Sequence, residues 1–207
     1  PIPLVARPVP PAIVDGGDVG PAPEGEFLLA DVQRSLFPLP AGRRIVQLRV
    51  YQLLPKSRTD NAADPRIGHP DQSNARMLLG TVPVEDDGSA YFRAPACKPL
   101  YFQAVDGAGR AVQGMRTVVY LQPGERRSCV GCHEPPGAAP AVRAVRAALR
   151  PPSVIQPGPA GTRPFGYVQL IQPLLNQHCT RCHDGTAGPE KSELTLTGEH
   201  TALFTRS

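Results

Sequence analysis

Residues 44–54 read RIVQLRVYQLL, and this stretch decides the fold class. The alternation places one set of side chains on one face, Ile45, Gln47, Arg49 and Tyr51, and another set on the opposite face, Val46, Leu48 and Val50. Successive side chains of a β-strand point to opposite faces, so this pattern predicts a strand with one buried face.

Similar short runs rich in Val, Ile, Leu, Tyr and Phe precede and follow this stretch. They are FLLADV (27–32), RMLLGTVPVE (76–85), SAYFRAP (89–95), PLYFQAVD (99–106) and RAVQGMRTVVYLQ (110–122). Asp86-Asp87-Gly88 and Asp106-Gly107-Ala108-Gly109 separate runs, and such Asp-Gly sequences are hairpin signals because glycine adopts positive φ without a steric cost. We therefore expect a mainly β fold, an antiparallel sandwich-like domain over residues 26–128.

The regions on either side of this domain are rich in proline. The chain of 207 residues contains 26 prolines and 20 glycines, and residues 1–25 show neither helical nor strand periodicity. We interpret residues 1–25 as an extended arm, with a disordered tail as the alternative. Residues 129–164 hold a Pro-, Ala- and Arg-rich linker with a short helix expected at 141–150, whose arginines form a solvated face.

A second helix is expected from Phe165 to about Gln177. Val168, Ile171, Leu174 and Leu175 share one of its faces, and Pro173 should kink it or start a new turn. Residues 165–207 are therefore predicted to form a small α-helical segment.

The charge and hydropathy of the chain argue against two classes of partner. The net charge is +4, but the 22 Lys and Arg residues form no run with interleaved aromatic residues, so we expect no nucleic acid partner. No apolar run approaches the roughly 20 residues that cross a bilayer, so no membrane span is expected. The chain begins at Pro1, which suits either a mature secreted product or a piece of a longer protein.

Four of the five cysteines fall into two copies of Cys-x-x-Cys-His, the attachment motif of haem c. The first copy is Cys129, Cys132 and His133, and the second is Cys179, Cys182 and His183. Two residues between the thiols let both sulfurs reach the vinyl groups of one porphyrin, and the next histidine reaches the iron. The sequence therefore predicts two haem c groups, with His133 and His183 as proximal iron ligands.

A structural zinc site is the rival interpretation of the cysteine pairs. Zinc ribbons separate their pairs by about 15 to 20 residues, whereas 46 residues lie between Cys132 and Cys179. Disulfides or a redox-active dithiol need no histidine after each pair, so haem is preferred. Haem c is attached outside the bacterial cytoplasmic membrane, which predicts a periplasmic or extracellular location. Cys97, the odd cysteine, is expected to be a small buried hydrophobe, with pairing to another chain as the alternative.

The second axial ligand of each iron has several candidates, since histidine and methionine are the usual residues. They are His69, His178, His200, Met77 and Met115. His200 follows the second motif, which favours it for the second haem, and His178 could reach a neighbouring haem. Met77 and Met115 lie in strand-like runs, where a core role is the alternative.

Residues 79–134, which end in ERRSCVGCHE, resemble the middle domain of the hydrazine synthase alpha-subunit family. The resemblance implies a β-rich domain that presents a c-type haem at its edge, with Cys129, Cys132 and His133 matching the family's motif. In that family the first haem is catalytic and a tyrosine soon after the motif binds iron, whereas here Glu134-Pro135-Pro136-Gly137-Ala138 follow. The segment PLLNQHCTRCHDG resembles the opening of an ordinary cytochrome c domain.

These observations support three hypotheses about function. The first is a dihaem electron carrier with redox partner proteins, in a homo-oligomer or an assembly with other cytochrome subunits, and with no catalytic residue assigned. The second is a hydrazine-synthase-like haem enzyme of nitrogen-compound redox chemistry, and the third is a haem module of a larger protein. No hydrolase or kinase motif is present.

Overall fold

The computed structural model describes residues 22–55, 75–132, 137, 139, 143–185 and 194–198. The strands are β1 (Glu24–Asp31), β2 (Ile45–Leu53), β3 (Arg76–Pro83), β4 (Ala90–Pro95), β5 (Leu100–Asp106), β6 (Ala111–Gly114) and β7 (Arg126–Gly131). A 3₁₀ turn, η2 (Arg146–Leu149), and two short helices, α1 (Tyr167–Leu170) and α2 (Gln172–His178), follow. The expectation of a mainly β fold is confirmed.

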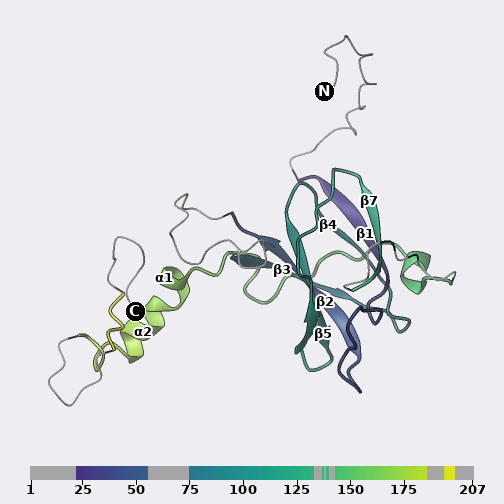
Figure 1. Cartoon of the computed structure of the whole chain (residues 1–207). Coiled ribbons are helices and arrows are strands. Elements are labelled where there is room, and N and C mark those ends of the chain that lie inside the picture. The colour runs from purple at the N-terminus through teal and green to yellow at the C-terminus, as the bar shows by residue number, and fades with distance from the viewer. Residues whose placement is uncertain are drawn as a thin grey trace, which may run out of the picture.

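The strands form two sheets, with the order β4-β1-β7 in one and β3-β2-β5-β6 in the other (Figure 1). The alternating stretch that decided the fold class is β2, which pairs antiparallel with both β3 and β5. It is therefore a central strand, and its buried residues include Leu48 and Val50 on the face predicted to be apolar.

The core lies between the two sheets. Phe27 of β1 and Phe92 of β4 come from the smaller sheet, and their rings meet Phe102 of β5 from the larger one. The centroid separations are 5.7 Å for Phe27 and Phe92, 5.0 Å for Phe27 and Phe102, and 5.4 Å for Phe92 and Phe102. The two contacts of Phe102 are edge-to-face, a geometry that adds to the burial energy, so this aromatic cluster joins the sheets.

Strand pairing differs from the expectation of a purely antiparallel domain. β7 pairs parallel with β1, with Leu29 opposite Cys129. The sequence does not predict β7, because Arg126, Arg127 and Ser128 carry no run of β-branched or aromatic residues. The strand forms because its backbone completes the hydrogen bonding along β1.

One of the two predicted hairpins is wrong. Asp106-Gly107-Ala108-Gly109 connects the antiparallel neighbours β5 and β6, as predicted, and the Asp106 carboxylate accepts backbone hydrogen bonds from Ala108 and Arg110. The turn at residues 86–88 instead joins β3 to β4, which belong to different sheets. A local turn signal shows that the chain reverses, but it does not identify the strand that pairs next.

Residues 143–156, here called the strap, run back across the β domain. Ser153 and Gln156 form isolated β-bridges with Phe92 and Thr81. Only η2 is helical in the segment where a helix at 141–150 was expected, and residues 141 and 142 lie outside the described residues.

Two of the three strap arginines, Arg143 and Arg150, are not simply solvated, as was expected, because their side chains bind the domain, whereas Arg146 is exposed. Arg143 pairs with Asp31 at 3.5 Å and Arg150 with Glu85 at 2.7 Å. The contacts therefore fix where the chain leaves the sandwich.

After the strap, α1 and α2 lie to one side of the β domain (Figure 1). They are separated at Ile171, and Pro173 lies in the first turn of α2, where its missing N–H costs little. The predicted break at Pro173 is therefore observed. Apolar side chains of this segment stay exposed, among them Phe165, Val168 and Leu174.

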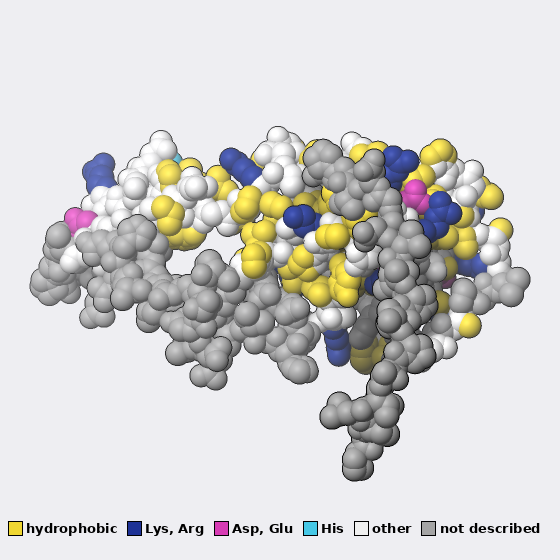
Figure 2. Space-filling view, turned by 90° about the horizontal axis from the view of Figure 1, so that it is seen from above, with side chains coloured by type: hydrophobic (Ala, Val, Ile, Leu, Met, Phe, Trp, Pro, Cys, Tyr) yellow, Lys and Arg dark blue, Asp and Glu magenta, His cyan; other side chains and the backbone are white. Residues whose placement is uncertain are grey.

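On the face shown in Figure 2, Lys and Arg side chains are scattered among apolar and uncharged side chains. The figure shows no continuous basic stripe over the described residues of this face. Among the described residues, no helix is long and apolar enough to cross a membrane.

Candidate functional site

The candidate site is a pocket of about 340 Å³ at the edge of the sandwich, beside β7. It is lined by residues of both sheets and of the loop after β6: Phe27, Leu29, Leu48, Phe92, Phe102, Met115, Arg116, Thr117, Val119, Cys129, Gly131 and Cys132. The lining is therefore almost wholly apolar.

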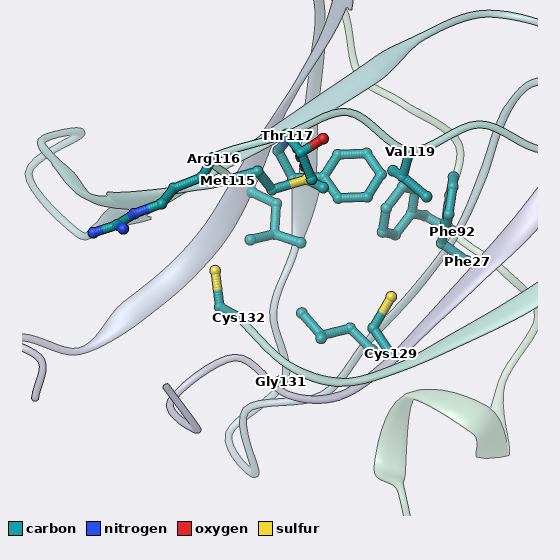
Figure 3. A pocket seen from close by; sticks show the side chains of 12 residues that line it. Phe27, Phe92, Met115, Arg116, Thr117, Val119, Cys129, Gly131 and Cys132 are labelled. Carbon is teal, nitrogen blue, oxygen red and sulfur yellow. Dashed lines mark hydrogen bonds between the residues drawn. The ribbon is translucent and has the colours of Figure 1, made fainter. Parts of the chain in front are cut away.

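Both cysteines of the first motif line this pocket. Figure 3 shows their sulfurs pointing from the β7 side into the pocket, across from Met115. In a continuous strand, residues three apart would face opposite sides. Because β7 ends at Gly131, Cys132 turns toward the same pocket as Cys129.

The backbone of Cys132 is held from two directions. Its N–H donates to the Arg34 carbonyl at 2.9 Å, and its carbonyl accepts a hydrogen bond from Gln113 Nε2 at 3.2 Å. The Gln113 side chain also hydrogen bonds with the Ser35 hydroxyl. Sequence reasoning missed Arg34, Ser35 and Gln113, because they lie far from the motif in sequence.

Gly131 permits the chain to pass this closely to the turn at Arg34. A Cβ at position 131 would lie 2.3 Å from the Arg34 carbonyl oxygen. The glycine inside the first motif therefore has a packing role. A Gly within a strand was the only sequence signal for such a close approach.

Met115 is the candidate axial ligand that the structure brings to this pocket. Its Sδ accepts a hydrogen bond from the Phe102 backbone N–H at 3.2 Å, which helps to orient the thioether. Arg116 lies at the pocket edge with its guanidinium 5.0 Å from the centroid of the Phe37 ring, and Figure 3 shows it pointing away from the pocket. Met77 instead packs against the core cluster from β3.

The start of β7 is anchored by polar contacts beside the core. Arg126 pairs with Glu26 at 2.8 Å, and the Tyr91 hydroxyl donates to the same carboxylate. The hydrogen bond from Tyr91 lowers the pKa of Glu26 and raises the pKa of Tyr91. These contacts keep the strand that carries Cys129 in register with β1.

The second motif begins at the end of α2. Cys179 caps this helix, and its carbonyl accepts hydrogen bonds from the N–H groups of Cys182 and His183 at 3.1 and 3.0 Å. Cys179 is half-buried, Cys182 is exposed, and both are free thiols. His183 Nδ1 is buried without a hydrogen-bond partner among the described residues.

The remaining predicted residues are placed as follows. His178 is the exposed last residue of α2. His69, His133 and His200 lie outside the described residues. Cys97 was predicted to be buried, and this is wrong: it is exposed in the turn after β4 with φ of 56°, because the turn directs its side chain outward.

The arrangement of the first site limits the kind of group it can hold. The first offers two sulfurs inside an apolar pocket, which suits covalent attachment of a flat apolar cofactor. No cluster of three or more His, Cys, Asp or Glu side chains that could hold a metal ion occurs among the described residues.

The segment that forms most of this pocket is similar to a known protein family. Residues 43–134 match the family described as the hydrazine synthase alpha subunit middle domain. The hydrazine synthase subunit alpha of Kuenenia stuttgartiensis is 40% identical over 58 residues, which is 28% of this chain and 7% of that protein. A chain of the solved Kuenenia stuttgartiensis hydrazine synthase matches with a TM-score of 0.61 and 21% identity.

The structural match covers 89% of this chain and 33% of the solved chain, so this chain spans about a third of that relative's length. At this identity the match establishes a shared fold. The matched segment runs from the start of β2 to the first Cys-x-x-Cys-His motif, and so contains much of the pocket. Residues 43–134 therefore belong to the hydrazine synthase alpha subunit middle-domain family.

Proposed function

We propose that this chain is the haem-bearing part of a hydrazine-synthase-like redox enzyme that acts on small nitrogen compounds. One observation carries the proposal: both sulfurs of the first motif line one apolar pocket in the segment that matches the family. The relative's name supplies the reaction class, and its designation as a subunit supports assembly with other chains.

The residues of the first site fit a c-type haem. Cys129 and Cys132 would form the two thioether bonds, and the aromatic cluster would exclude water from the buried edge of the macrocycle. A bound haem iron exchanges single electrons and takes small nitrogen ligands at an open position. Arg34 and Gln113 hold the backbone of Cys132, so their role is to fix the attachment point.

The second motif would bind a second haem through Cys179 and Cys182, with His183 as iron ligand. Its exposed Cys182 leaves this haem near the surface, which suits electron exchange with a partner protein. Attachment of haem c would place the protein in the periplasm or outside the cell.

The first experiment counts haem in the full chain, produced in bacteria that attach haem c. We expect two haems per chain by pyridine haemochrome assay, and one after replacement of Cys129 and Cys132 by Ala or of Cys179 and Cys182 by Ala. Peptide mass spectrometry locates each haem. Cys97→Ala is the matched control and should keep both haems. A wild-type chain without covalent haem overturns the proposal.

A dihaem electron carrier is the second candidate, and the position of Met115 favours it. Its thioether lies across the pocket from the two cysteine sulfurs, where ligation would close the iron to substrates. The chain has two methionines, so Met77→Leu is a matched control for Met115→Ala.

Spectroscopy separates these two candidates. In the enzyme, the first haem is high-spin, binds nitric oxide or hydroxylamine, and is unchanged by either methionine substitution. In the carrier, the first haem is low-spin and becomes high-spin in Met115→Ala alone. A first haem that is low-spin and becomes high-spin only in Met115→Ala would show that the function is electron transfer and not catalysis.

A further inference from the structure

Three buried polar atoms lack hydrogen-bond partners in one small part of the described chain: Gln172 Oε1, His183 Nδ1 and Thr197 Oγ1. They belong to α2, to the second motif and to residues 194–198, which lie beside α2 (Figure 1). A buried polar group left without a partner costs about 1–3 kcal/mol. Native proteins contain few such groups, so three together call for a structural reason.

The backbone of Leu196 links the three elements. Its N–H donates to the His183 carbonyl at 2.9 Å, and its carbonyl accepts a hydrogen bond from Gln172 Nε2 at 2.8 Å. Residues 194–198 therefore connect the side chain of Gln172 to the backbone of the motif histidine.

Gln172 is an unusual residue for its position. It is the buried residue of α2, with 6% of its surface exposed, whereas Leu174 of the same helix is 54% exposed. Gly198 packs directly on it, because a Cβ at position 198 would lie 2.4 Å from Gln172 Cδ. Burial of an amide where leucine would gain more from burial points to a polar role.

The amide is only half satisfied. Its Nε2 donates to Asn176 Oδ1 and to the Leu196 carbonyl, each at 2.8 Å, and these bonds leave Oε1 as an unused acceptor. His183 Nδ1 is an unused group in the same region. A histidine that binds metal through one ring nitrogen almost always donates the other N–H to an acceptor, which fixes the ring and raises its basicity.

We propose that Gln172 is the positioning residue for His183 at the second haem. Its Oε1 accepts the Nδ1–H of His183 through one bridging water, while its Nε2 keeps residues 194–198 in place. This role rests on the proposed second haem, and it assigns a polar function to a residue outside the family-matched segment.

The test compares the reduction potential of the second haem in the full chain and in three variants. Gln172→Leu removes the acceptor and should favour reduction about tenfold, or about 59 mV for a one-electron couple. Gln172→Glu supplies a stronger acceptor and should shift the potential in the opposite direction. A role limited to packing would not produce opposite shifts from these two substitutions.

Gln177→Leu is the matched control, since Gln177 lies in the same helix and is exposed. It should leave the potential and the electron paramagnetic resonance of the second haem unchanged. Thr197→Val tests the other unpartnered group and should also leave the potential unchanged.

The outcomes separate this inference from the proposed function. In one outcome, haem is bound at Cys179 and Cys182 and its reduction potential is the same in wild type, Gln172→Leu and Gln172→Glu. This outcome overturns the role of Gln172 but leaves the proposed second haem intact. A shift in Thr197→Val alone assigns the role to Thr197 and likewise overturns it. If Gln172→Leu loses haem, an unshifted potential in Gln172→Glu is sufficient to reject the inference. Absence of haem from this motif in wild type means that the proposed second haem itself has failed.

Discussion

At the scale of single residues, the direction of the thiols in the first motif depends on residues that lie far from it in the sequence. Cys132 is 8% exposed, and its orientation follows from the end of β7 at Gly131. The motif supplies two thiols, but the approach of the turn at Arg34 decides that both line the same pocket.

Gly131→Ala tests this approach. The added Cβ would meet backbone, the Arg34 carbonyl oxygen, so the strand or the turn must move. We expect a loss of about 1–3 kcal/mol of unfolding free energy in urea, as for other overpacked sites. Haem occupancy at Cys129 and Cys132 should fall with it.

Gly107→Ala is the matched control, because a Cβ at position 107 meets no heavy atom within 4 Å. It should change stability by less than about 0.5 kcal/mol. Equal effects of the two substitutions would contradict the packing role of Gly131.

Asp106→Asn tests the acidic group at the β5–β6 turn. The backbone N–H of Arg110 lowers the pKa of Asp106, burial opposes this, and the N–H of Ala108 and the charge of Arg110 lower it further. A carboxylate with a lowered folded pKa stabilises the fold above its unfolded pKa of about 3.9. That stabilisation is lost as the pH falls through the folded pKa.

The wild type should therefore be more stable than Asp106→Asn at pH 7, and the two should converge as the pH falls below about 4. Urea unfolding at a series of pH values measures this difference. A difference that stays constant down to the acid limit would exclude the ionised carboxylate as its cause.

At the scale of elements, the strap shows how a proline-rich segment gains a fixed path. η2 has no side-chain cap of its own, and Asp87 of the β3–β4 turn accepts the Arg146 N–H at 2.9 Å. The same carboxylate accepts hydrogen bonds from the N–H and hydroxyl of Ser89, and the Ser89 hydroxyl accepts the Ala147 N–H. The predicted hairpin turn thus serves as a cap for a distant element.

Asp87→Ala removes this cap. Since it leaves the N–H of Arg146 without its acceptor, we expect a loss of about 1–2 kcal/mol in urea unfolding. Proteolysis of the strap should become faster, because local opening depends on the same contacts.

Asp86→Ala provides the neighbouring control. Asp86 pairs with Arg44 on the surface, and an exposed pair contributes about 0–1 kcal/mol. If Asp86→Ala loosened the strap as much as Asp87→Ala, the capping role would be wrong.

At the scale of the whole molecule, the aromatic cluster joins the two sheets and also lines the candidate site. Phe92 is 1% exposed and contacts the rings of Phe27 and Phe102. Stability and the shape of the pocket therefore depend on the same side chains.

Phe92→Ala should lower the free energy of unfolding by about 3–5 kcal/mol, the usual penalty for a buried phenylalanine. Both sheets should still unfold in one transition. Urea unfolding followed by far-ultraviolet circular dichroism measures the loss. Phe165→Ala is the control, because Phe165 is 71% exposed and its loss should cost less than about 0.5 kcal/mol. A Phe92→Ala cost as small as that of Phe165→Ala would show that the cluster does not hold the sheets together.

The sequence by itself determined the mainly β class, the position of β2, the β5–β6 turn and the helix break at Pro173. Each of these follows from local information, namely side-chain alternation, glycine in a turn and the missing N–H of proline. The spacing of the cysteines and histidines also identified two haem c motifs, and attachment of haem at them stays a prediction.

Only the tertiary structure decided which strands pair and where the motif thiols point. β7 forms because β1 offers it a parallel partner, and the turn at residues 86–88 joins two sheets. The pocket combines residues from both sheets with the loop after β6, and the backbone of Leu196 links Gln172 to the second motif. Such contacts depend on long-range packing and hydrogen bonding, which no local pattern of residues specifies.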